Sequence, residues 1–129
     1  CASLRSINIP DSVITIDYSA FMGCRALRTV TTGNGVQTIE KQAFLGCENL
    51  TTLILSKSIK KINSTAFTQC SIHSIYYCGS SSEWSDIYIG DSSNLAGATI
   101  YYYSENEPTV EGNYWHYGAD GEVLIWDAK

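Results

Sequence analysis

Five cysteines and two histidines are the residues of this 129-residue chain best suited to metal, redox or nucleophilic chemistry. Four of the cysteines recur at one fixed interval, at Cys1, Cys24, Cys47 and Cys70. A zinc site needs ligands that converge on one point, commonly supplied by close Cys-x-x-Cys pairs, and this spacing offers none. We therefore predict no metal site and no cofactor.

A disulfide within this cysteine series is harder to exclude. If the segments that carry these cysteines stack side by side, equivalent cysteines lie about 4.8 Å apart, which is within the Cα range of a disulfide. Their side chains would then point the same way, which strains the dihedral angle of the bridge. The fifth cysteine, Cys78, makes the count odd. We predict buried thiols that fill space in a core, with a disulfide as the alternative. Counting reactive thiols in denatured, unreduced protein separates the two.

The histidines and carboxylates give no catalytic arrangement. Neither His73 nor His116 comes with a motif that would place it as a base beside a serine. His73 has no second histidine or carboxylate at ligand spacing and is predicted to be a surface residue. Glycoside hydrolysis needs two converging carboxylates, whereas the acids here lie mostly in predicted loops. The sequence favours a non-enzymatic protein over a hydrolase.

The charge is divided unevenly. The segment 1–61 carries seven Lys or Arg against four Asp or Glu, whereas the segment 62–129 carries one against nine, for a net charge of −5. Affinity for nucleic acid comes mainly from clustered Lys and Arg, so a nucleic-acid partner is not expected. No run of about 18 apolar residues is present, which argues against membrane insertion.

The chain begins inside a repeat, without a signal-peptide pattern, and we interpret it as a processed or trimmed piece of a longer protein. We expect a monomer. The open first repeat would expose a strand edge through which trimmed molecules could associate end to end.

The cysteine spacing is part of a repeat that organises the chain. Three gapless units lie at 1–23, 24–46 and 47–69. Apolar residues recur at equivalent places in each unit, as do three phenylalanines, Phe21, Phe44 and Phe67. Each unit holds two short stretches in which apolar residues alternate with polar ones, and a turn separates the two. A stretch with an acidic residue followed by an alanine comes next, which is typical of one helical turn. Units of this kind bury their apolar side only by stacking on one another, which predicts a solenoid.

The first unit reads Leu4-x-x-Ile7-x-Ile9-Pro10, then Val13-x-x-Ile16-x-x-x-Ala20-Phe21-x-x-Cys24. This pattern resembles the BspA-type leucine-rich repeat, a family found largely on the surfaces of bacteria and of some protozoan parasites. The resemblance covers residues 1–78, with a shortened fourth repeat. It implies an α/β repeat fold, a right-handed leucine-rich-repeat solenoid that is β-dominated with short helical turns. It also implies an extracellular or cell-surface location, and contacts made through the concave, strand-lined face.

The repeat breaks after Cys78, and three further segments are predicted: a C-terminal cap at 79–104, a linker at 105–112 and a β-hairpin at 113–129. Ser80-x-x-Glu83 is a capping box that predicts a helix start. Trp84, Ile87 and Ile89 would then cover the last coil. Alternating residues on either side of Gly118–Gly121 predict the hairpin.

Alternation along the predicted strands turns every second side chain outward. We predict that the chain is a protein-binding or adhesion module for a host or bacterial surface protein, contacting it through Arg5, Arg28, Thr29, Thr52, Ile54, His73 and Tyr76. The hydroxyl side chains among these residues, Thr29 and Thr52, could also be no more than a surface that favours β-strands and tolerates water. The alternative function is a carbohydrate-binding module that stacks sugars on C-terminal aromatic residues, Trp115, Tyr117 and Trp126.

Overall fold

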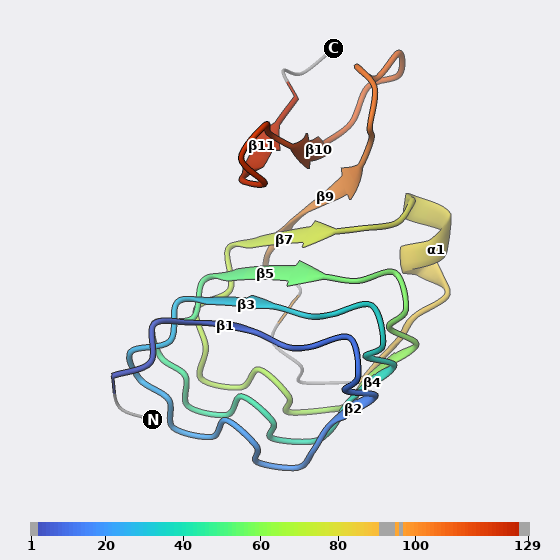
Figure 1. The fold of residues 1–129 in the computed structure, drawn as a ribbon. Helices are drawn as coiled ribbons and strands as arrows, with labels where there is room; N and C mark the ends of the chain where they lie inside the picture. The colour runs from blue at the N-terminus through green and yellow to red at the C-terminus, as the bar shows by residue number, and fades with distance from the viewer. Residues whose placement is uncertain (1–2, 91–94, 96, 127–129) are drawn as a thin grey trace.

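The computed structural model describes residues 3–90, 95 and 97–126, which form a stack of coils followed by a hairpin (Figure 1). Two sheets run along the stack. The seven-stranded sheet, here the long sheet, is ordered β1 (Ser6–Asn8), β3 (Thr29–Thr31), β5 (Thr52–Leu55), β7 (Ser74–Tyr77), β9 (Thr99–Tyr103), β10 (Tyr114–Tyr117) and β11 (Val123–Ile125). The four-stranded sheet, here the short sheet, is ordered β2 (Thr15–Ile16), β4 (Thr38–Ile39), β6 (Lys61–Ile62) and β8 (Tyr88–Ile89).

The period of the repeat sets the register of both sheets. Val30 of β3 pairs in parallel with Ile7 of β1 on one side and with Leu53 of β5 on the other. The short sheet repeats this pattern, with Ile39 of β4 between Ile16 and Ile62. Equivalent residues therefore lie beside one another in successive coils, which confirms the predicted solenoid.

The core is a column that runs through the coils. The rings of Phe21 and Phe44 stack with centroids 5.2 Å apart, and those of Phe44 and Phe67 stack at the same separation. Phe44 and Phe67 are fully buried. Stacking each phenylalanine on its equivalent lets identical units share one continuous core.

The return segment of each coil differs from the prediction. We expected a single helical turn from Asp17 to Phe21 and at the equivalent places. The structure instead has successive tight turns there, because Ser19, Gln42 and Thr65 adopt left-handed φ values of 59°, 59° and 62°. A residue in that conformation cannot continue a right-handed helix. The short helical turns of the predicted fold are thus corrected to tight turns.

Polar side chains join the coils at the turns. The backbone N–H of Asn34 donates to Asp11 Oδ1 at 2.8 Å, and the side-chain Nδ2 of Asn63 donates to Glu40 Oε1 at 2.6 Å. Gly35 packs so closely that a Cβ added there would overlap the Asp11 carbonyl oxygen. These contacts set the close approach of neighbouring coils.

The segment predicted as a cap extends both sheets. It begins with α1 (Ser81–Ser85), whose N-terminus carries the predicted capping box: Glu83 N donates to Ser80 Oγ, and Ser80 N donates to Glu83 Oε1. Trp84 and Ile87 are buried against the core, as predicted. β8 then pairs in parallel with β6, and β9 with β7, so this segment adds one strand to each sheet. Within the described residues, no helix is long and apolar enough to cross a membrane.

The predicted hairpin is present and continues the long sheet, although residues 127–129 of the predicted segment lie outside the described residues. β10 pairs in parallel with β9 and antiparallel with β11. Two indole groups fasten it: Trp115 Nε1 donates to the Tyr77 carbonyl oxygen and Trp126 Nε1 to the Ser104 carbonyl oxygen, both at 2.8 Å. Figure 1 shows the hairpin beyond β9, at the end of the stack.

Candidate functional site

The outer face of the long sheet, from β1 to β9, carries two columns of side chains that alternate with core residues. We call this surface the outer face. Its first column is Ser6, Thr29, Thr52, Ser74 and Thr99, and its second is Asn8, Thr31, Ile54, Tyr76 and Tyr101. In β5 and β7 the outward residues are half-buried whereas the inward ones are buried, as period-2 alternation requires.

Four of the predicted contact residues lie on the outer face: Thr29, Thr52, Ile54 and Tyr76. The other three, Arg5, Arg28 and His73, come just before the strands and lie at the margin where the strands begin. There the Arg28 amide donates to the Arg5 carbonyl oxygen at 2.7 Å, and all three side chains are exposed. The seven predicted contact residues therefore lie in one region, four on the outer face and three along one margin of that face.

Sequence reasoning missed the part of the outer face that β9 supplies. Thr99 pairs with Ser74, and Tyr101 with Tyr76, so both columns continue into the fifth coil. The interval from Ser74 to Thr99 is longer than the period of the preceding units, which broke the alignment. The signal was the similarity of Ser74–Tyr77 to 99–102, both of which read hydroxyl, Ile, Tyr, Tyr.

Aromatic side chains cluster where the outer face meets the hairpin. The Tyr76 and Tyr101 rings stack with centroids 5.0 Å apart, and Trp115 meets Tyr76 edge-on at 5.9 Å. Trp115 also meets Tyr103 at 5.3 Å and Tyr117 at 4.8 Å, both edge-on. These contacts, with the indole hydrogen bond to Tyr77, leave Trp115 fully buried. We call Tyr76, Tyr101, Tyr103, Trp115 and Tyr117 the aromatic cluster.

The sugar-stacking alternative requires exposed ring faces on Trp115, Tyr117 and Trp126. Trp115 offers none, which corrects its inclusion in that set, because the hairpin is fastened over it. Trp126 stacks on His116 with centroids 3.9 Å apart and is half-buried. Tyr117 is 48% exposed. Most ring faces of this region are thus used within the protein.

The aromatic cluster has one titratable neighbour of note. Burial raises the pKa of the Cys78 thiol. Burial, together with the adjacent Cys78, raises the pKa of Tyr117 to about 12. Both groups are therefore neutral at physiological pH, and this end of the surface offers apolar and hydrogen-bonding contacts.

The cysteines are divided between two chemical states. Cys47 and Cys70 are buried thiols, and each Sγ donates to the carbonyl of the phenylalanine one coil earlier, at 3.0 Å to Phe21 and 3.1 Å to Phe44. Cys24, in contrast, is disulfide-bonded, so the predicted thiol is wrong at this position. Cys1 lies outside the described residues.

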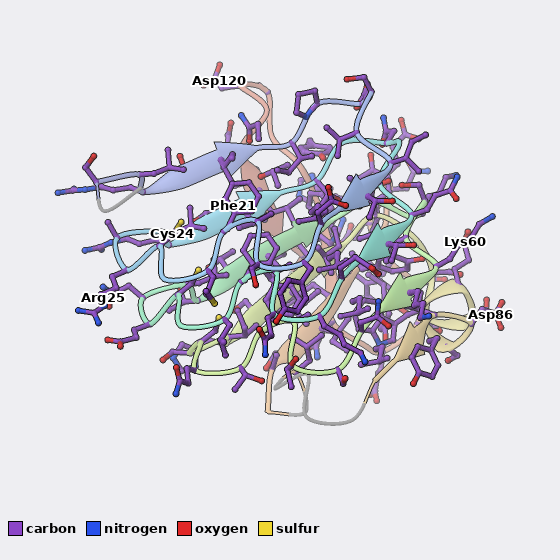
Figure 2. The ribbon with its side chains drawn as sticks, turned by 90° about the horizontal axis from the view of Figure 1, so that it is seen from below. Phe21, Cys24, Arg25, Lys60, Asp86 and Asp120 are labelled. Atoms are coloured by element: carbon purple, nitrogen blue, oxygen red, sulfur yellow. The ribbon has the colours of Figure 1, made fainter. Side chains whose placement is uncertain are left out.

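No group of three His, Cys, Asp or Glu side chains that could hold a metal ion occurs in the part of the chain that the structure describes. Figure 2 shows Arg25 and Lys60 on opposite sides of the stack.

Comparison with known proteins finds a matching family and a similar crystal structure. The family described as "BspA type Leucine rich repeat region (6 copies)" matches residues 1–96, beyond the end at Cys78 that the sequence pattern suggested. A leucine rich cell surface protein from Faecalibacterium prausnitzii A2-165 has a similar crystal structure, with a TM-score of 0.59 and 30% sequence identity. The similarity covers 68% of this chain and 30% of that protein. No curated protein matches the chain. The chain belongs to the BspA-type leucine-rich repeat family.

Proposed function

We propose that the chain is a non-enzymatic, extracellular interaction module of a bacterial surface or secreted protein, and that it binds a protein partner through the outer face. The observation that carries the proposal is the continuity of the two outward columns over five adjacent strands. Such a surface repeats hydrogen-bonding groups about 4.8 Å apart on a rigid sheet.

The chemistry of the columns suits a protein interface. The first column bears a hydroxyl group in all five strands. The second changes from Asn8 and Thr31 to Ile54, Tyr76 and Tyr101 toward the hairpin. Protein interfaces typically combine an apolar, aromatic-rich centre with polar surroundings, and tyrosine is among the residues that dominate binding energy. We place the strongest contacts at Ile54, Tyr76 and Tyr101.

A protein partner is favoured over a glycan because the aromatic rings are engaged with each other. Sugar binding of the kind considered above uses an open ring face. Tyr76 and Tyr101 cover one face of each other, and Trp115 is enclosed. The ring edges and hydroxyl groups that remain are suited to the mixed contacts of a protein surface.

The proposed location rests on the family and on the similar structure. The F. prausnitzii protein is described as a leucine rich cell surface protein, and this chain spans 30% of its length. A cell-surface location exposes the outer face to other proteins of host or bacterial origin, as adhesion would require.

The test is a binding screen with matched substitutions on the two sheets. Purified protein is presented to a panel of host extracellular proteins, bacterial surface proteins and glycans. Each hit is then measured against Thr52→Arg on the long sheet and Thr38→Arg on the short sheet. Both threonines are half-buried strand residues, so the substitutions carry similar structural costs.

We expect Thr52→Arg to weaken binding of a protein hit by tenfold or more, on the order of 1.4 kcal/mol. Thr38→Arg should leave binding unchanged. Equal loss in both variants, or loss with Thr38→Arg alone, would contradict the assignment of the outer face. Hits confined to glycans would contradict the protein partner.

A further inference from the structure

Cys47 and Cys70 occupy equivalent positions in successive coils and are the pair from which we draw a further inference. Both are buried, with exposures of 0% and 8%. Backbone hydrogen bonds join the two coils directly beside them, from Phe44 N to the Ala66 carbonyl oxygen and from Gly46 N to the Thr68 carbonyl oxygen, both at 2.9 Å. Backbone segments joined by such hydrogen bonds lie about as far apart as neighbouring strands, about 4.8 Å, which is within the Cα range of a disulfide.

The local backbone gives these two cysteines more rotational freedom than a strand would. Each directly follows a turn segment, after a residue with left-handed φ: Gly46 at 78° before Cys47 and Gln69 at 65° before Cys70. Side chains in a pleated strand are held parallel to their equivalents, whereas a turn can tilt them. Cys24, in the same column, is disulfide-bonded, so a bridge is compatible with this part of the coil.

We propose that Cys47 and Cys70 form a disulfide under oxidising conditions, which links the second and third return segments of the solenoid. With a small-molecule disulfide R′S–SR′ as oxidant, the Cys47 thiolate attacks one sulfur and releases R′S⁻. The Cys70 thiolate then displaces the second R′S⁻ from the Cys47 sulfur. Both S–H protons end on the two released R′SH molecules, and the two electrons reduce the R′S–SR′ bond.

The order of attack follows from the interaction between the two thiols. The interaction of the two side chains, together with burial, raises the pKa of Cys70. The same interaction lowers the pKa of Cys47. Cys47 therefore ionises first, and a thiolate is the reactive form in thiol–disulfide exchange. A bridge of this kind would be retained outside the cell, where disulfides persist.

The experiment equilibrates the native protein with oxidised glutathione, quenches it in acid, alkylates the remaining thiols and maps the peptides without reduction. We expect the three thiols of Cys47, Cys70 and Cys78 to fall to one, with a bridged peptide that contains Cys47 and Cys70. Cys78→Ser should retain this bridge, whereas Cys70→Ser should show none. The thermal midpoint should rise on oxidation in the unmodified protein and not in Cys70→Ser.

Three results would overturn the proposal: persistence of all three thiols at equilibrium, glutathione adducts without a bridge, or a bridge that contains Cys78. If Cys70→Ser does not fold, the peptide map of the unmodified protein and of Cys78→Ser decides the question. Cys78 is the suitable control because it lies outside the cysteine column, beside Tyr117.

Discussion

The repeated coils and the C-terminal segment contribute to one sheet by different means. In the coils, each residue packs on its own equivalent, as Phe44 does between Phe21 and Phe67. In the C-terminal segment, β9 still pairs with near copies, such as Ile100 beside Ile75, whereas β10 is held by unlike contacts such as the enclosure of Trp115. The strands of both regions nevertheless pair in parallel from β1 to β10.

This difference shows that a strand can join the sheet without belonging to an identical repeat. A new strand needs inward apolar residues and a free neighbouring edge, and Ile100 meets this requirement beside Ile75. An identical unit always has these apolar residues at the same positions. A dissimilar unit needs a specific contact of its own, as Trp115 provides for β10. We therefore expect substitutions in the coils to affect the whole stack and substitutions in the hairpin to act locally.

The largest effect is expected from Phe44→Ala. Removing a fully buried ring that stacks on both sides should lower the free energy of unfolding by about 3–5 kcal/mol. Phe21→Ala is the matched variant, with a smaller expected loss because Phe21 is half-buried and stacks on one described neighbour. Urea unfolding followed by circular dichroism measures both. Equal losses would show that the stack does not share its core.

Trp115→Ala should have its effect mainly in the hairpin. The substitution empties the space beneath β10 and removes the hydrogen bond to the Tyr77 carbonyl oxygen. Amide exchange should accelerate in β10 and β11 and stay unchanged in β3 and β5. Trp115→Phe keeps an aromatic ring and loses the hydrogen bond, for a local cost of about 1 kcal/mol. Faster exchange throughout the stack would show that the two regions unfold together.

Ser80→Ala should lower stability by about 1 kcal/mol, since the Ser80 hydroxyl accepts from Glu83 N at the start of α1. Ser81→Ala, one residue along, leaves both capping hydrogen bonds in place and serves as the control. Urea unfolding of the two variants provides the comparison. No difference between them would mean that packing of Trp84 alone fixes the helix.

The smallest effect is a loss of stability in alkali. The pKa of Tyr117 is raised from 10.0 to about 12, so the folded protein holds this proton more tightly than the unfolded chain. Its contribution is complete below pH 10 and is lost as the pH rises toward 12. Tyr117→Phe should weaken the decline of the thermal midpoint between pH 9 and 11.5. An identical decline in Tyr117→Phe would assign it to other groups.

The sequence was sufficient for features that are set by the fixed period of the repeat or by a short local motif. The ladders of Phe21 and Val30, the capping box at Ser80 and the hairpin at Gly118–Gly121 follow from spacing or local chemistry. The same reasoning placed Thr29, Thr52, Ile54 and Tyr76 on one face, as the register of β3, β5 and β7 has them.

The remaining features depend on contacts between unlike residues. The left-handed conformation of Ser19, Gln42 and Thr65 is not encoded by a glycine, so a helical turn was predicted instead. The burial of Trp115 results from contacts with Tyr76 and with the Tyr77 carbonyl oxygen, both of which lie far from it in the sequence. No period or motif connects these positions, and only the folded chain brings them together.

The long sheet continues without interruption from the repeats into β9, β10 and the hairpin. Native-state hydrogen exchange tests this continuity directly, resolved to single amides. We predict that the amides of Tyr102 and Ser104, which donate to the Asn113 and Trp115 carbonyl oxygens, are protected to within about tenfold of the β5 amides. Exchange of these amides at the rate of an unstructured peptide, with β5 and β7 still protected, would contradict a continuous sheet.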